Sequence, residues 1–255
     1  MTTTEATLYS VEAGAAWITL NRPENRNALS QILVTELHGH LTAAVQDPNV
    51  RCIVIMGNGP AFCAGADLKN RNQGENSGPT LPDVLKLIID SPKPVIAAIN
   101  GAAFAGGLGL VGACDIVVAV EDAKFSFSEV RIGVIPAIIA VVCVPKLGTH
   151  QAMKLFVTGE QFTGAQAVGF GLAHRAVAKD RLRAAVQEEI DMICLGAPTA
   201  VAECKKLVRR AAEPRPLDDA FREMAEWSRR MFMSADGQEG MASFREKRKP
   251  SWVKK

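Results

Sequence analysis

Residues 91–134 read SPKPVIAAINGAAFAGGLGLVGACDIVVAVEDAKFSFSEVRIGV, and this stretch decides the fold. Its apolar run at 94–99 contains β-branched residues and ends in an Asn-Gly pair, which predicts a buried strand followed by a turn. A second apolar segment opens with two glycines at 106–107 and predicts a helix, and a third apolar run at 116–120 predicts another strand. Strands that alternate with helices in this way indicate an α/β protein.

The same stretch contains the elements of a catalytic site. The glycines at 106–107 let backbone come close to a ligand, and the helix start after them presents free N–H groups at the positive end of the helix dipole. Glu129 is a lone carboxylate in the otherwise uncharged segment 125–130. Taken alone, a glycine pair before a helix more often serves close packing, and a single glutamate is usually solvated or paired. Together they suggest an oxyanion site beside a group that transfers protons at carbon.

Composition limits the other functions that need to be considered. The chain has 255 residues, of which 48% are hydrophobic and 22% charged, as in an ordinary globular protein with one main domain and an appendage. Its net charge of +2 gives no case for binding nucleic acid or a membrane surface. No apolar stretch reaches membrane-spanning length, and the N-terminus lacks the regions of a signal peptide. We therefore expect a cytoplasmic protein.

Cysteine and histidine spacing predicts neither disulfides nor metal. The six cysteines include no C-x-x-C pair and mostly lie in apolar runs, so they are interpreted as small buried hydrophobic residues. The four histidines do not have the spacing of a metal-binding motif.

Before the central stretch, apolar patterns predict a hairpin and then a helix over 30–46 with Ser30 as its N-cap. The apolar run at 52–56 predicts a strand that ends in Gly57-x-Gly59. A dinucleotide-binding turn is disfavoured there, because the third glycine is missing and a proline follows. Gly65 permits a tight turn, and residues 70–81 are a polar loop.

After the central stretch, residues 132–144 are almost wholly apolar and are either core or the wall of a ligand pocket. Helices are predicted over 149–156 and 165–170, and a short strand over 173–177. Beyond residue 180 the pattern is helical throughout, and Asp236-x-x-Glu239 suggests a capping box for a last helix that ends near Pro250.

Four motifs in order resemble those of the enoyl-CoA hydratase/isomerase (crotonase) superfamily, over essentially the whole chain. They are NRPENRNAL at 21–29, FCAGADLK at 62–69, the segment 101–115, and EGMASFREKR at 239–248. The resemblance implies an α/β fold, a crotonase-like spiral of ββα units with a C-terminal helical extension. It also implies a core over 1–195, an oligomerisation region over 196–255, and a homotrimer or a dimer of trimers.

The resemblance makes the substrate an acyl-CoA thioester, with coenzyme A as part of the substrate and no separate cofactor. Its carbonyl would lie between the backbone N–H groups of Ala66 and Gly106, and Glu129 matches a catalytic glutamate. Phe244 and Lys247 match residues that reach the CoA of a neighbouring subunit. The expected CoA-contacting residues are Arg26, Ala28, Ala64, Ala66, Asp67, Leu68, Lys69, Gly106, Phe244 and Lys247.

One departure from the family pattern leaves the reaction open. Common hydratases carry two glutamates, but here Gly109 occupies the first position and Glu129 alone matches the second. A lone carboxylate suffices for the proton shuttle of an isomerase. However, residues 106–110 and 128–137 resemble a subgroup of hydratases of branched, methyl-bearing enoyl-CoAs, and the bulky residues at 137–140 imply an apolar acyl pocket.

Three hypotheses follow from this pattern. The first is an enoyl-CoA hydratase that uses Glu129, the second an enoyl-CoA isomerase with the same base, and the third a non-catalytic CoA-binding member. A serine hydrolase is disfavoured, because no G-x-S-x-G elbow is present.

Overall fold

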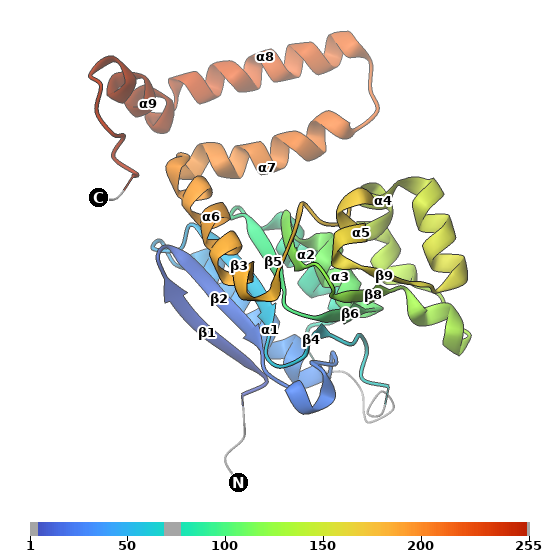
Figure 1. Cartoon of the computed structure of the whole chain (residues 1–255). Coiled ribbons are helices and arrows are strands. Elements are labelled where there is room, and N and C mark those ends of the chain that lie inside the picture. Colours follow the sequence, from blue (N-terminus) through green and yellow to red (C-terminus); the bar gives the residue numbers. More distant parts are fainter. Residues whose placement is uncertain (1–4, 69–77, 254–255) are drawn as a thin grey trace.

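The computed structural model describes residues 5–68 and 78–253 (Figure 1). Lys69 and most of the expected loop at 70–81 lie outside the described residues. The larger sheet has six strands in the order β1-β2-β3-β5-β7-β10, antiparallel between β1 and β2 and parallel elsewhere. Its strands are β1 (Thr7–Glu12), β2 (Ala15–Leu20), β3 (Cys52–Gly57), β5 (Val95–Ile99), β7 (Ile116–Val120) and β10 (Arg175–Val177).

A second sheet of four strands, in the order β4-β6-β8-β9, was not predicted by the hydrophobic pattern of the sequence. Each of its strands is three residues long, too short to show a hydrophobic period. They are β4 (Ala61–Cys63), β6 (Ala102–Phe104), β8 (Lys124–Ser126) and β9 (Gln161–Thr163). Because β4, β6 and β8 each follow a strand of the larger sheet and precede a helix, the chain repeats a ββα unit, which confirms the predicted fold class.

Nine α-helices occur in the described residues (Figure 1). They are α1 (Gln31–Gln46), α2 (Leu81–Asp90), α3 (Gly106–Ala113), α4 (Ala137–Thr158), α5 (Gly164–Gly169), α6 (Leu182–Leu195), α7 (Pro198–Ala212), α8 (Leu217–Met233) and α9 (Ala235–Arg245). The first helix begins as predicted, because the Ser30 hydroxyl accepts the N–H of Leu33 at 3.4 Å. No helix in the described part of the chain combines the length and apolar character that a membrane span requires.

Helix α4 is longer than the sequence predicts. It begins within the apolar run and continues past Gly148, whose φ of 68° and ψ of 159° interrupt its regular geometry. An unbroken run of apolar side chains hides the helical period, yet Ile139 and Cys143 are buried whereas Val141 is 73% exposed. Residues 137–144 of the run are therefore helical, with a core face and an exposed face.

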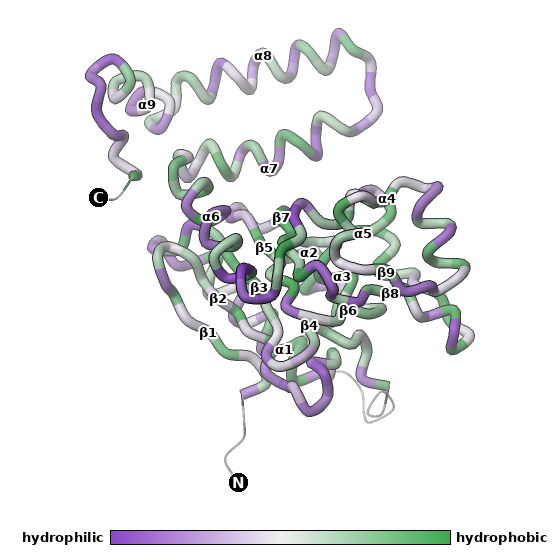
Figure 2. The backbone as a smooth tube through the Cα atoms, viewed as in Figure 1, coloured by the Kyte–Doolittle hydropathy of each residue, from purple (hydrophilic) through white to green (hydrophobic). Residues whose placement is uncertain are grey.

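The last three helices form an extension beside the two sheets. Figure 1 shows α8 and α9 apart from the sheets, with α7 between. Figure 2 shows hydrophobic and hydrophilic segments alternating along α7 and α8. Neither helix has a buried residue. Their exposed large apolar side chains include Val208, Leu217, Phe221, Phe232 and Met233.

The expected capping box of the last helix is wrong. The N-cap of α9 is Ser234, whose hydroxyl accepts the N–H of Gly237 at 3.1 Å. Asp236 instead accepts the N–H of Thr199, and Glu239 pairs with Arg248 beyond the helix end.

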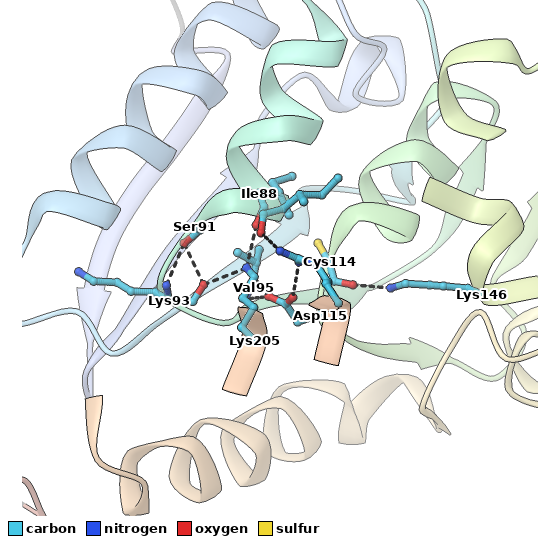
Figure 3. Close-up of polar contacts among 10 residues, drawn as sticks. Ile88, Ser91, Lys93, Val95, Cys114, Asp115, Lys146 and Lys205 are labelled. Carbon is cyan, nitrogen blue, oxygen red and sulfur yellow. Dashed lines mark hydrogen bonds and ion pairs between the residues drawn. The ribbon is translucent and has the colours of Figure 1, made fainter. Parts of the chain in front are cut away.

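A buried lysine attaches α7 to the α/β core (Figure 3). The Nζ atom of Lys205 lies 2.7 Å from Oδ2 of Asp115 and donates to the carbonyl of Ile88 at 2.8 Å. Asp115 also accepts the N–H of Val95 at 2.8 Å, so the carboxylate joins β5 to α7. The Lys205 side chain is only 7% exposed. The attachment therefore depends on a charge pair that is shielded from water.

Replacing Lys205 by methionine is expected to lower the free energy of unfolding by about 3 kcal/mol, because it leaves the Asp115 carboxylate partly buried without its main cation. Chemical denaturation measures the loss. The matched control is Lys206→Met, which removes an exposed cation paired with Glu203 and should cost about 1 kcal/mol or less. Equal losses of unfolding free energy in the two variants would contradict a Lys205–Asp115 pair that is shielded from water.

Candidate active site

Backbone hydrogen bonds join two loops of the candidate site, the loop that contains Leu29 and the loop at residues 65–67. The Leu29 N–H donates to the carbonyl of Gly65 at 2.8 Å, and the Leu29 carbonyl accepts the N–H of Asp67 at 3.5 Å. The residue between, Ala66, forms an isolated parallel bridge with Leu29. In a parallel bridge the bonds to one residue come from the neighbours of its partner. The N–H of Ala66 therefore points away from Leu29, toward the other side of its strand.

Gly65 brings this segment against the start of α3. Its φ is +91°, and a Cβ atom there would lie 2.9 Å from the Phe104 carbonyl oxygen and 3.2 Å from the Gly106 nitrogen. A side chain would therefore be strained and would separate the two segments. A Cβ atom on Gly106 would in turn lie 3.7 Å from the Ala66 nitrogen, so the amides of Ala66 and Gly106 are close neighbours.

Gly106 is the first residue of α3. The first N–H groups of a helix have no acceptor within it, and the positive end of the helix dipole lies there. Ala105 before it has φ 47° and ψ −122°, and its N–H donates to Ser126 of β8 at 3.1 Å. Two amides from separate elements thus meet at a helix N-terminus, an arrangement that can stabilise an oxyanion.

Glu129 follows three residues after Ser126, in the 3₁₀-helix η2 (Ser128–Ile132). The hydrogen bond between Ala105 and Ser126 therefore ties the segment of Glu129 to the start of α3. Its carboxylate is half-buried, and Oε2 has no hydrogen-bond partner among the described residues. Burial raises the pKa of the Glu129 carboxyl above its ordinary value of 4.5. A carboxyl with a raised pKa and an unused oxygen suits acid–base catalysis.

Beside Gly109 the space is already filled. A Cβ atom on Gly109 would lie 2.5 Å from Cγ2 of Ile139 and 3.6 Å from Cδ1 of Leu85. Ile139 belongs to the apolar first turn of α4 and is buried. The position that holds a second carboxylate in common hydratases is therefore closed by an aliphatic side chain.

The family model "Enoyl-CoA hydratase/isomerase" matches residues 10–255 of the chain. The chain belongs to this family. It is 32% identical to mevalonyl-coenzyme A hydratase sidH of Aspergillus fumigatus, over 92% of this chain and 90% of that protein. It is 33% identical to carnitinyl-CoA dehydratase of Proteus mirabilis, over 92% and 93%. The structure of the enoyl-CoA hydratase from Mycobacterium smegmatis superposes with a TM-score of 0.89 at 32% identity, covering 98% of this chain and 99% of that one.

Most residues expected to contact CoA in this hydratase/isomerase family member gather along the two joined loops. The carbonyl of Arg26 accepts the N–H of Ala64 at 2.9 Å, which places Ala28 beside the same segment. Asp67 and Leu68 continue from Ala66, and Leu68 is 57% exposed.

Two further CoA candidates, Phe244 and Lys247, lie elsewhere in the chain. Phe244, on α9, is 86% exposed, and Lys247 follows that helix in a left-handed conformation with φ 54°. α9 packs against α7 and α8, and Figure 1 shows it far from β4 within one chain. A contact between these residues and the loop pair therefore requires a second subunit.

Sequence reasoning missed two residues of this region, Asn27 and Ile139. Asn27 is a fully buried polar residue, and its place inside the motif at 21–29 was the available signal. The contact of Ile139 with Gly109 arises only when α3 and α4 pack. No group of three or more histidine, cysteine, aspartate or glutamate residues in the described ranges could hold a metal ion.

Proposed function

We propose that the protein is an enoyl-CoA hydratase, which adds water to a 2-enoyl-CoA with Glu129 as its single acid–base group. The observation that carries this proposal is the half-buried Glu129 carboxyl, whose segment is tied to the start of α3 beside the amides of Ala66 and Gly106. The names of two relatives, a hydratase and a dehydratase of CoA thioesters, support it.

The mechanism follows from these groups. The thioester carbonyl oxygen accepts the N–H groups of Ala66 and Gly106, so negative charge that develops there is stabilised by two fixed donors and the helix dipole. Glu129 takes a proton from water as the water oxygen bonds to C3, and a proton passes from the same carboxyl to C2. Because one group serves both transfers, both new bonds form on one face and the addition is syn.

An enoyl-CoA isomerase is the second candidate, and Ile139 favours it. With the space beside Gly109 closed, one carboxylate remains for the chemistry. That carboxylate can take a proton from C2 of a 3-enoyl-CoA and return it to C4, which moves the double bond without water. A non-catalytic CoA-binding protein is the third candidate.

One series of substrates separates the three candidates. Saturated, 2-enoyl and 3-enoyl CoA thioesters, straight and branched, are incubated with the protein and analysed by product mass and thioester absorbance. Gain of one water from a 2-enoyl ester identifies the hydratase, and faster gain from branched esters supports a branched substrate. A moved double bond at unchanged mass identifies the isomerase, and binding without turnover identifies the CoA-binding protein.

Gly109→Glu alone is expected to gain no hydratase activity on a straight-chain 2-enoyl-CoA. The new side chain meets Ile139, and overpacking of this kind typically costs about 1–3 kcal/mol of stability. The double variant Gly109→Glu with Ile139→Ala should recover stability and hydrate the straight-chain ester at least about tenfold faster than Ile139→Ala alone, because it adds a second acid–base group. Full stability of Gly109→Glu by thermal unfolding would contradict the closed space.

We also propose that residues 196–255 mediate assembly into a homotrimer or a dimer of trimers. The exposed apolar side chains of α7 and α8 support this, because monomers rarely leave such surface uncovered. The proposed location is the cytoplasm, where cysteines stay reduced, and the cysteines of the described residues form no disulfide.

Replacing Lys247 by alanine is expected to weaken CoA affinity by about 1–2 kcal/mol without changing the oligomer, because one charge-assisted phosphate contact from a second subunit is lost. Calorimetry measures the affinity and light scattering the oligomer. Lys249→Ala removes a nearby exposed charge and is the control. Truncation before Asp236 should weaken both CoA affinity and assembly. A wild-type protein that is monomeric and still binds CoA with full affinity would refute the dependence of CoA binding on a second subunit.

A further inference from the structure

Asn27 is a fully buried polar residue in an unusual backbone conformation. Its φ is 55°, in the left-handed region, and Arg26 before it also has a positive φ, 52°. Few residues other than glycine adopt this conformation, and asparagine is one of those that adopt it most readily. The sequence therefore places at position 27 a residue that tolerates the turn and still carries a hydrogen-bonding side chain.

The side-chain amide of Asn27 makes three hydrogen bonds to backbone. Its Oδ1 accepts the N–H of Arg22 at 2.8 Å, and its Nδ2 donates to the carbonyls of Asn58 at 3.0 Å and Ala61 at 2.9 Å. Because the first partner only donates and the other two only accept, the orientation of the amide is unambiguous. Asn27 thus holds its own loop against the first residue of β4.

Backbone hydrogen bonds connect the region that Asn27 holds to Ala66. β4 ends at Cys63, and the next residue donates its N–H to the carbonyl of Arg26, beside Asn27. Two residues beyond Asn27, Leu29 bonds to both neighbours of Ala66. The direction of the Ala66 N–H therefore depends on two backbone segments, the loop from Asn27 to Leu29 and the segment from β4 to Ala66. The side chain of Asn27 holds these two segments together.

We propose that Asn27 is a positioning residue, which aims the N–H of Ala66 at the substrate carbonyl. The inference rests on the proposed oxyanion site of Ala66 and Gly106. A purely structural role does not account for the arrangement, since the loop has other anchors. The N–H of Asn21 donates to Ala6 at 2.8 Å, and Pro23 packs against Gly59. Those anchors hold the loop on the core but do not reach Ala66.

The test measures polarisation of the bound carbonyl directly. A 2-enoyl-CoA conjugated to an aromatic ring is bound at saturation to Glu129→Gln protein, which prevents turnover, and the shift of its absorption to longer wavelength is recorded. Asn27→Asp keeps the acceptor for Arg22 but loses both donors, and Asn27→Gly keeps the left-handed backbone but loses the side chain. Asn25→Asp makes the same chemical change at a nearby residue of the same loop.

In the Glu129→Gln background, Asn27→Asp and Asn27→Gly should lose at least half of the spectral shift per bound ligand, and Asn25→Asp should keep it. With Glu129 restored, kcat per folded enzyme should fall about a hundredfold in the Asn27 variants, the usual cost of misplacing a reacting group by about 1 Å. An unchanged shift and kcat in either folded variant overturns the inference. Failure of both to fold assigns Asn27 to folding alone and overturns it as well. Absence of any shift with Asn27 intact would instead refute the oxyanion site.

Discussion

Glu129→Gln is expected to lower kcat by at least about a hundredfold while the affinity for CoA stays within a few-fold. A general acid–base group typically contributes about 10²–10⁴ to the rate, and glutamine retains the shape of the side chain but cannot exchange a proton. The CoA candidates lie on other segments, so binding does not depend on this carboxyl. Steady-state kinetics and calorimetry measure the two quantities. Retention of a tenth or more of the wild-type kcat would remove Glu129 from the mechanism.

The raised pKa of Glu129 adds a pH signature to this prediction. The carboxylate must be ionised to accept a proton, so kcat/KM should fall as the pH drops through a value above 4.5. The folded state binds this proton more tightly than the unfolded state, so the contribution of Glu129 to stability decreases as the pH rises from 4.5 through the folded pKa. Glu129→Gln should lack that decrease, which denaturation at several pH values measures.

Gly106→Pro is expected to lower kcat about a hundredfold to a thousandfold, the usual cost of losing one oxyanion donor. Proline replaces the N–H of residue 106 by its ring Cδ, and proline is well tolerated at the first position of a helix. The matched control is Gly106→Ala, which keeps the N–H and adds the same contact with Leu29, whose Cδ1 lies 2.9 Å from the added Cβ.

The difference between the two variants measures the loss of the N–H group together with its replacement by the proline Cδ. Gly106→Ala should lose less than about tenfold, because the neighbouring leucine side chain can rotate away. Circular dichroism and thermal unfolding confirm that both variants fold. Equal kcat values for folded Gly106→Pro and Gly106→Ala would show that the amide of Gly106 does not take part.

The fold could be predicted where the sequence of an element had the length and hydrophobic pattern of a strand or a helix. The apolar runs at 52–56, 94–99 and 116–120 have strand length and end in turn residues, and they are β3, β5 and β7. The second sheet was not predictable, because pairing between strands of three residues depends on contacts distant in sequence. The start of α4, residues 137–144, was missed because every position in it is apolar, and only packing decides which face is buried.

Individual residues of the candidate site could be recognised in the sequence, but the contacts between them could not. Glu129 stands out as a lone carboxylate, and the glycines before α3 mark a close approach of backbone. The sequence also shows that Gly109 lacks a carboxylate, but Ile139, which fills the space, lies thirty residues later and meets it only through helix packing. Likewise Asn27 belongs to a polar motif, and its link to Ala66 depends on hydrogen bonds that no spacing reveals.

The central claim is that Glu129 exchanges a proton with the α-carbon of a thioester held by the amides of Ala66 and Gly106. The most direct test incubates a saturated acyl-CoA with the enzyme in heavy water and follows deuterium at C2 by mass spectrometry, because this step is common to hydratase and isomerase. Wild type should incorporate deuterium, Gly106→Pro should do so far more slowly, and Glu129→Gln should not. Equal incorporation by wild type and Glu129→Gln, or none by wild type, would contradict the account.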